Sequence, residues 1–292
     1  MRGVGMKGAA IMVAATAILV AGPSFAEDKS SYTLFNPTPD RLLRDMTTDR
    51  PDVTESPFTV DAGHIQIESN LFGYWRSRPD EEGTVTDSYD VARTNLRVGL
   101  TSSLELSLVW QPYGVVVAHP RAPAPAIRNS GMGGVAVRMK YNVWGNDTFE
   151  KPGSTALALL PILILPTDRD NGISPEHVEG ALIAPFGIKL TDKFGLTFNG
   201  GVAFVRQGEM TSHDAEYLAS ASLSYEWNDK LGTYYEVGGA FDREDPLGDV
   251  AFVGTGFTYK INKNLQLDGG VNFGVTRASD RVNPFIGLSA RF

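Results

Sequence analysis

From residue 64 to the C-terminus, the chain repeats short segments in which every second side chain is apolar. In the last of them, Pro284, Ile286 and Leu288 share one face, and Ser289 and Arg291 belong to the other. A period of two places alternate side chains on opposite faces of a β-sheet. Most segments have about 9–13 residues, the length that a tilted strand needs to cross a bilayer. The sequence contains twelve, at residues 64–75, 88–100, 104–117, 133–143, 154–166, 180–190, 194–206, 215–227, 231–241, 249–261, 264–276 and 283–292.

The links between these segments alternate in length. Tight turns, such as 101–103, 191–193 and 228–230, are separated by longer polar links, such as 118–132 and 167–179. Outer-membrane barrels alternate short periplasmic turns and longer extracellular loops in this way, and an even strand number brings both ends to the periplasmic side. We therefore predict an all-β fold, in which residues 64–292 form a closed antiparallel transmembrane β-barrel of about 12 strands.

A soluble periplasmic β-sandwich would also show alternation, and it is the alternative. The turn and loop rhythm, the even strand number and the aromatic residues near strand ends, such as Trp110 and Trp227, favour the barrel. The chain ends in Phe292, with apolar residues at alternate positions before it. This ending is typical of outer-membrane proteins, and we expect Phe292 to be a signal for the outer-membrane barrel assembly machinery.

Residues 1–26 have the pattern of a secretory signal peptide. Arg2 and Lys7 precede an apolar run at residues 9–20, and small residues at positions 24 and 26 allow cleavage after Ala26. An uncleaved anchor helix is the alternative, but the run is short for a membrane span. Since no cysteine follows the cut, a lipoprotein is excluded. The sequence thus predicts export to the bacterial outer membrane, with the signal peptide cleaved after Ala26.

Charge and cysteine content exclude several functions. The net charge is −8, and it falls to −10 when Arg2 and Lys7 are removed with the signal peptide. This balance argues against nucleic acid as a partner, because nucleic-acid binding requires a basic surface. The chain has no cysteine, so a disulfide framework, a zinc–thiolate site and a thiol nucleophile are excluded.

Residues 27–63 differ from the rest, because they are rich in Pro, Asp and Thr and show little periodicity. The run Thr47–Glu68 contains TDRPDVTESPFTV followed by GHIQIE. It resembles the opening of the outer-membrane transporter family named for the meta-pathway of phenol degradation, and this resemblance implies a channel or transporter barrel. We interpret residues 27–63 as an N-terminal periplasmic or plug segment, with a tether as the alternative. The candidate plug residues are Asp49, Arg50, Asp52 and Glu55.

The polar faces of the strands would line the barrel if the apolar faces meet lipid. Their charges have two interpretations: a network of ion pairs that holds the barrel in shape, or a constriction whose field selects solutes. Small residues near the last five strands, such as Ser222 and Gly270, would leave space at the wall. The candidate lumen and constriction residues are Glu68, Arg97, Glu105, Arg138, Lys140, Lys189, Glu226, Glu236, Asp268 and Arg291.

We expect no enzymatic activity, metal or cofactor. Some outer-membrane barrels are phospholipases that use Ser, His and Asn, but none of the four histidines lies in a His-x-Ser-Asn run. The predicted function is a channel or transporter for small solutes, hydrophobic or aromatic ones among them. The alternative is a structural or adhesive barrel with a filled lumen and no transport. Expected partners are a small-molecule solute, outer-membrane lipid, lipopolysaccharide and the assembly machinery.

Overall fold

The structure, a computed structural model, describes residues 28–167, 171–206, 212–242 and 248–292. The predicted signal peptide lies outside these residues. The described chain is almost entirely β-structure, with a single 3₁₀ turn at Asp40–Leu42. Its strands are β1 (Ile65–Arg76), β2 (Val85–Gly99), β3 (Leu104–Trp110), β4 (Tyr113–His119), β5 (Ile127–Gly131), β6 (Val135–Trp144), β7 (Thr155–Leu165), β8 (Glu179–Lys189), β9 (Phe194–Val205), β10 (Asp214–Glu226), β11 (Leu231–Asp242), β12 (Val250–Asn262), β13 (Leu265–Gly274) and β14 (Asn283–Arg291).

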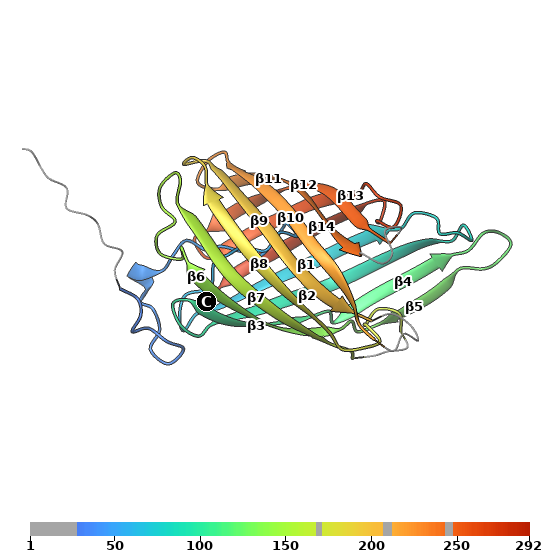
Figure 1. The fold of residues 1–292 in the computed structure, drawn as a ribbon, viewed down its shortest axis with the longest axis horizontal. Helices are drawn as coiled ribbons and strands as arrows, with labels where there is room; N and C mark the ends of the chain where they lie inside the picture. Colours follow the sequence, from blue (N-terminus) through green and yellow to red (C-terminus); the bar gives the residue numbers. More distant parts are fainter. Residues whose placement is uncertain (1–27, 168–170, 207–211, 243–247) are drawn as a thin grey trace, which may run out of the picture.

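These strands close into one antiparallel barrel (Figure 1). Consecutive strands pair in order, and β1 pairs with both β2 and β14, which closes the ring. Two transmembrane strands are interrupted: β3 continues as β4 across Gln111 and Pro112, and β5 continues as β6 across residues 132–134. Proline has no N–H to donate, so the ladder breaks at Pro112. The fourteen segments therefore make a barrel of twelve strands, and the predicted fold class and strand number are confirmed.

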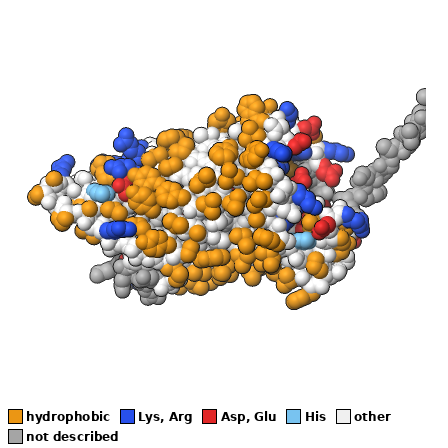
Figure 2. Space-filling view, turned by 180° about the vertical axis from the view of Figure 1, so that it is seen from behind, with side chains coloured by type: hydrophobic (Ala, Val, Ile, Leu, Met, Phe, Trp, Pro, Cys, Tyr) orange, Lys and Arg blue, Asp and Glu red, His pale blue; other side chains and the backbone are white. Residues whose placement is uncertain are grey.

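The alternation in sequence becomes a division between lipid and lumen. On the face shown in Figure 2, apolar side chains that point outward form a broad band across the middle of the barrel, and charged side chains collect toward its two ends. Such a band matches the hydrocarbon layer. Among the outward side chains that are at least one-third exposed are Ile67, Leu106, Val137, Leu163, Leu182, Phe198, Leu223, Val237, Val253, Phe273 and Ile286.

Strand β7 is apolar on both faces, and the sequence alone does not assign its sides. In the structure, Ala156, Ala158 and Leu160 are fully buried and point inward, while Leu159 and Leu163 are exposed on the lipid side. The even-numbered residues of β7 therefore give one part of the lumen an apolar wall.

The prediction for residues 118–132 was wrong in part. It made them a loop, but residues Ile127–Gly131 form β5, which pairs with β4. The β4–β5 hairpin and the first half of β2 extend beyond the barrel rim (Figure 1). Because this hairpin projects past the lipid, its strands need no alternation of apolar and polar residues, and the sequence signal is missing.

The short turns and both ends of the barrel lie at one rim, which we assign to the periplasm. Residues 33 and 34 pair with residues 101 and 100 beside the β2–β3 turn. The chain then enters the barrel before β1 begins. Among the described residues, no helix is both long and apolar enough to cross a bilayer.

Candidate functional site

Residues 44–60, here called the luminal segment, pass through the inside of the barrel. Inward-facing side chains of many strands contact this segment, from Gln66 on β1 to Arg291 on β14. Irregular backbone at membrane depth is tolerated where its polar groups are satisfied by the protein. The luminal segment therefore needs hydrogen-bond partners on the barrel wall.

Wall carboxylates supply many of these partners. A segment without helix or sheet has N–H groups that must find acceptors when it is buried, and hydrogen bonds to a carboxylate are stronger than neutral ones. The wall glutamates accept from the backbone N–H groups of the segment at donor–acceptor distances of 2.6–3.2 Å. The pairs are Glu68 with Asp49, Glu236 with Val53 and Thr54, and Glu105 with Val60.

Wall amides and arginines complete the attachment by binding the carbonyl oxygens of the segment. Arg97 donates to the carbonyl of Phe58 at 2.9 Å, and Asn142 donates to that of Pro57 at 2.8 Å. Gln66 donates to the carbonyl of Thr47 at 2.8 Å. Strand side chains thus bind both N–H groups and carbonyl oxygens of the segment's backbone. These hydrogen bonds fix the path of the segment.

The Asp49 side chain lies at the centre of a buried charge cluster. Its carboxylate contacts Lys140 directly, and it lies 3.4 Å from Nη1 of Arg97 and 3.7 Å from Nη2 of Arg138. The side chains of Arg97 and Lys140 are fully buried. Burial acts to raise the pKa of Asp49, but the charges of Arg97 and Lys140 outweigh it and hold that pKa well below its usual value. Asp49 is therefore ionised and neutralises cations that water cannot reach.

Arg50 points to the opposite wall from Asp49. Its guanidinium pairs with Asp268 on β13, with Nη2 to Oδ1 at 2.8 Å, and lies 5.8 Å from the ring centroid of Phe285 on β14. The backbone of Gly287 faces the same guanidinium, and a Cβ atom there would lie 2.2 Å from Nη2. Glycine at this position is what admits the arginine.

Asp52 and Glu55 differ in their surroundings. Glu55 pairs with Arg138 at 2.5 Å. Asp52 lies beside Glu236, and burial together with this like charge raises the pKa of Asp52 to about 8. Asp52 is therefore mostly neutral at pH 7, and it adds little negative charge to a region that already contains Glu236.

The structure brings most of the predicted lumen residues onto the luminal segment. Glu68, Arg97, Glu105, Arg138, Lys140, Glu236 and Asp268 are all buried and contact it. Arg291 also contacts it, at the carbonyl of Arg44 near the periplasmic rim. Lys189 and Glu226 are not in this cluster and line the periplasmic mouth instead. The charges thus join the wall to the segment as well as wall to wall.

Some luminal residues are missing from the sequence-based set. Gln66 and Asn142 follow the predicted alternation, but uncharged side chains give no specific signal. Arg93 also follows the predicted alternation, although it is not among the predicted lumen residues. Asp90 belongs to the opposite face in the alternation, and it reaches the lumen because Ala92, with a φ of 56°, changes the face to which the side chains of β2 point. A local change of backbone conformation at an alanine has no clear signature in the sequence.

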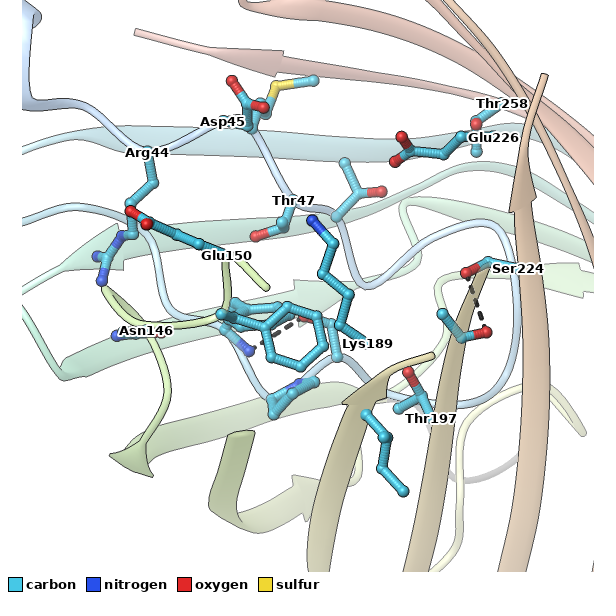
Figure 3. Close-up of a pocket in the computed structure, with 18 of the residues that line it drawn as sticks. Arg44, Asp45, Thr47, Asn146, Glu150, Lys189, Thr197, Ser224, Glu226 and Thr258 are labelled. Carbon is cyan, nitrogen blue, oxygen red and sulfur yellow. Dashed lines mark hydrogen bonds between the residues drawn. The ribbon is translucent and has the colours of Figure 1, made fainter. Parts of the chain in front are cut away.

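A cavity of about 750 Å³ separates the luminal segment from one side of the wall (Figure 3). It begins at the periplasmic turn 191–193 and reaches Asp52 on the segment and Ser222 on β10. The wall side includes several small hydroxyl side chains, and Ser224 donates to the carbonyl of Gly195 at 3.3 Å. The labelled wall residues in Figure 3 are Lys189, Thr197, Ser224, Glu226 and Thr258, with Thr47 on the segment.

No group of three or more His, Cys, Asp or Glu side chains suited to a metal ion occurs in the described part of the chain. His64 is held by backbone carbonyls, with Nε2 at 2.8 Å from the oxygen of Thr38 and Nδ1 at 3.1 Å from that of Phe292. This histidine therefore joins the segment before the barrel to the last strand.

A closed barrel with an apolar outer band and a lumen partly occupied by its own N-terminal segment defines a class, the outer-membrane β-barrel proteins. Residues 48–292 match the family model described as "MetA-pathway of phenol degradation", and the chain belongs to this family. The match begins within the luminal segment. The comparison with curated proteins finds no match.

Solved structures with the same fold include outer-membrane proteins of two kinds. The COG4313 outer membrane channel from Pseudomonas putida F1 aligns with a TM-score of 0.60 and 14% identity, over 84% of this chain and all of that one. The transport unit of the autotransporter AIDA-I from Escherichia coli aligns with a TM-score of 0.51 and 12% identity, over 78% of this chain and 90% of that one. These similarities establish the fold.

Proposed function

We propose that the protein is an outer-membrane channel for small solutes, in which the luminal segment narrows the barrel and solutes pass along the wall formed by β9–β12. The observation that carries this proposal is the cavity between the segment and that wall. The segment is tied by charged contacts to β1, β2, β6, β11 and β13. Between these contacts, Thr197, Ser222 and Thr258 on the cavity side are short. Small, neutral side chains leave a path where bulky charged ones would close it.

Two further observations support a channel. The P. putida protein with this fold is described as an outer membrane channel. A barrel of twelve strands is also wider than the eight-strand kind that side chains just fill, and narrower than a porin of sixteen strands. This width suits a restricted pore.

Hydrophobic or aromatic solutes are the proposed cargo. Ile162 and Ile164, which are partly exposed, give β7 an apolar inner face, on which such a solute could lie without losing hydrogen bonds. The family description refers to phenol degradation, which is consistent with aromatic cargo.

Export and assembly complete the proposal. Cleavage after Ala26 would release residues 27–292 to the periplasm, and Phe292, 70% exposed at the barrel rim, would be available to the assembly machinery. We also propose contacts of the finished barrel with outer-membrane lipid and lipopolysaccharide, and no catalytic role.

The alternative is a structural or adhesive barrel that transports nothing. The contacts between wall and segment favour this alternative, because they occupy part of the lumen. Refolded residues 27–292 in planar bilayers distinguish the two. We expect discrete single-channel currents, smaller than those of wide porins because the segment occupies part of the lumen. A barrel that shifts on heating in gel electrophoresis, and is thus folded, but passes no current would exclude the channel.

A further inference from the structure

Arg93 on β2 differs from the other arginines of the lumen. Its cross-strand partner is Asn70 on β1, and directly opposed residues share one face of a sheet. Asn70 is buried in the lumen, where it donates to Asp90 at 2.6 Å. Arg93 therefore points inward, four residues beyond Arg97 toward the extracellular rim. Its side chain is nevertheless exposed, so it lies in an open part of the lumen.

The neighbouring guanidinium groups are already engaged. Arg97 is fully buried between Glu68 and Glu105, Arg138 pairs with Glu55, and Arg50 pairs with Asp268. No ion pair joins Arg93 to a carboxylate among the residues that the structure describes. Asp90 on the same strand attracts Arg93 electrostatically, but the Asp90 carboxylate is buried and accepts from Asn70. Arg93 thus presents its donors to whatever fills the lumen.

Apolar side chains occupy the other side of the ring. In the strand order, β10 lies half the ring away from β2, and β8 and β7 lie four and three strands away from β2. Leu218 on β10, Ile183 on β8 and Ile162 on β7 share the inward parity of their strands. A solute above the luminal segment would therefore meet a guanidinium on one side and hydrocarbon on the other.

We propose that Arg93 is a docking point for the anionic group of the solute, and that the channel favours small organic anions with an apolar body, such as aromatic carboxylates. A guanidinium binds a carboxylate through two parallel hydrogen bonds, which a neutral solute lacks. The apolar side chains of the wall then favour a solute whose remaining part is apolar. This inference rests on the proposed channel function and adds the class of solute to it.

The test compares the wild-type chain with R93Q and R93K in planar bilayers. In a KCl gradient, we expect R93Q to lower the chloride-to-potassium permeability ratio by about fivefold, the effect of one charge at a few ångströms in water. We expect benzoate to reduce the wild-type current at lower concentrations than acetate or the neutral benzamide. R93Q should remove the advantage of benzoate over benzamide, and R93K should keep only part of it, because an ammonium has the charge but not the paired N–H donors of a guanidinium.

The matched control is R121Q, which removes an exposed arginine from the β4–β5 hairpin outside the lumen. It should leave the permeability ratio and benzoate block unchanged. If the wild type conducts and R93Q equals it in both readings, the docking site is excluded while the channel stands. If acetate blocks as well as benzoate, selection for an apolar body is excluded. If the folded wild type never conducts, the proposed function itself fails.

Discussion

Replacing residues 44–60 by a glycine–serine stretch of the same length should raise single-channel conductance about threefold or more. The reason is geometric: a twelve-strand barrel encloses a lumen wider than side chains alone can fill, and the luminal segment occupies much of it. The replacement keeps residues 28–43 at the β2–β3 turn and removes the side chains that bind the wall. Single-channel recording in planar bilayers measures the change.

The control for this replacement is the tip of the β4–β5 hairpin, residues 120–126, which lies outside the barrel. The same glycine–serine exchange there should leave the conductance as in the wild type. If the 44–60 replacement folds and conducts no better than the wild type, the segment does not limit the pore.

The substitution D49N should destabilise the folded barrel by about 3–5 kcal/mol, the usual cost of removing one partner from a buried ion pair. A neutral amide in place of the Asp49 carboxylate would leave Lys140, which is fully buried, with only the more distant Glu55 carboxylate at 3.9 Å. It would also weaken the hold on Arg97 and Arg138. Urea unfolding in detergent micelles, followed by the gel shift of the folded barrel, measures the loss.

D28N is the matched control, because Asp28 is an exposed aspartate whose carboxylate bonds only the nearby backbone of Ser30 among the contacts described. We expect it to change stability by no more than a few tenths of a kcal/mol. Equal urea midpoints for D49N and D28N would show that the Asp49 cluster contributes nothing, and would contradict the role given to it.

The strand pattern was predictable because lipid and lumen impose opposite chemistry on alternate residues. Segments such as 264–276 and 283–292 carry this alternation, and their observed strands lie within a few residues of the prediction. The pattern fails where one environment is missing. Strand β5 lies outside the membrane, and β7 is apolar on both sides because its inward-facing Ala156, Ala158 and Leu160 are buried and meet no water.

The site was predictable only in part. The alternation of apolar and polar residues placed Glu68, Arg97 and Asp268 on the inner face. The cluster of charges in residues 49–55 distinguished the segment from the strands. The ion pairs between wall and segment depend on the path of an irregular chain through the barrel. No periodicity in the sequence encodes this path. For example, Glu236 and Glu105 accept hydrogen bonds from backbone N–H groups of the segment. Every residue except proline has such a group, so the identity of the side chain gives no signal for these bonds.

The central claim, that the N-terminal segment lies inside the barrel against a defined wall, is tested most directly by a cross-link. Thr54 and Ser220 on β10 have hydroxyl oxygens 2.8 Å apart, and the chain has no cysteine of its own. The double variant T54C/S220C should form a disulfide in the folded barrel under mild oxidation. The pair T54C/A219C should not, because Ala219 faces the lipid. Efficient cross-linking of the first pair alone supports the claim, whereas no cross-link in a folded T54C/S220C barrel would contradict it.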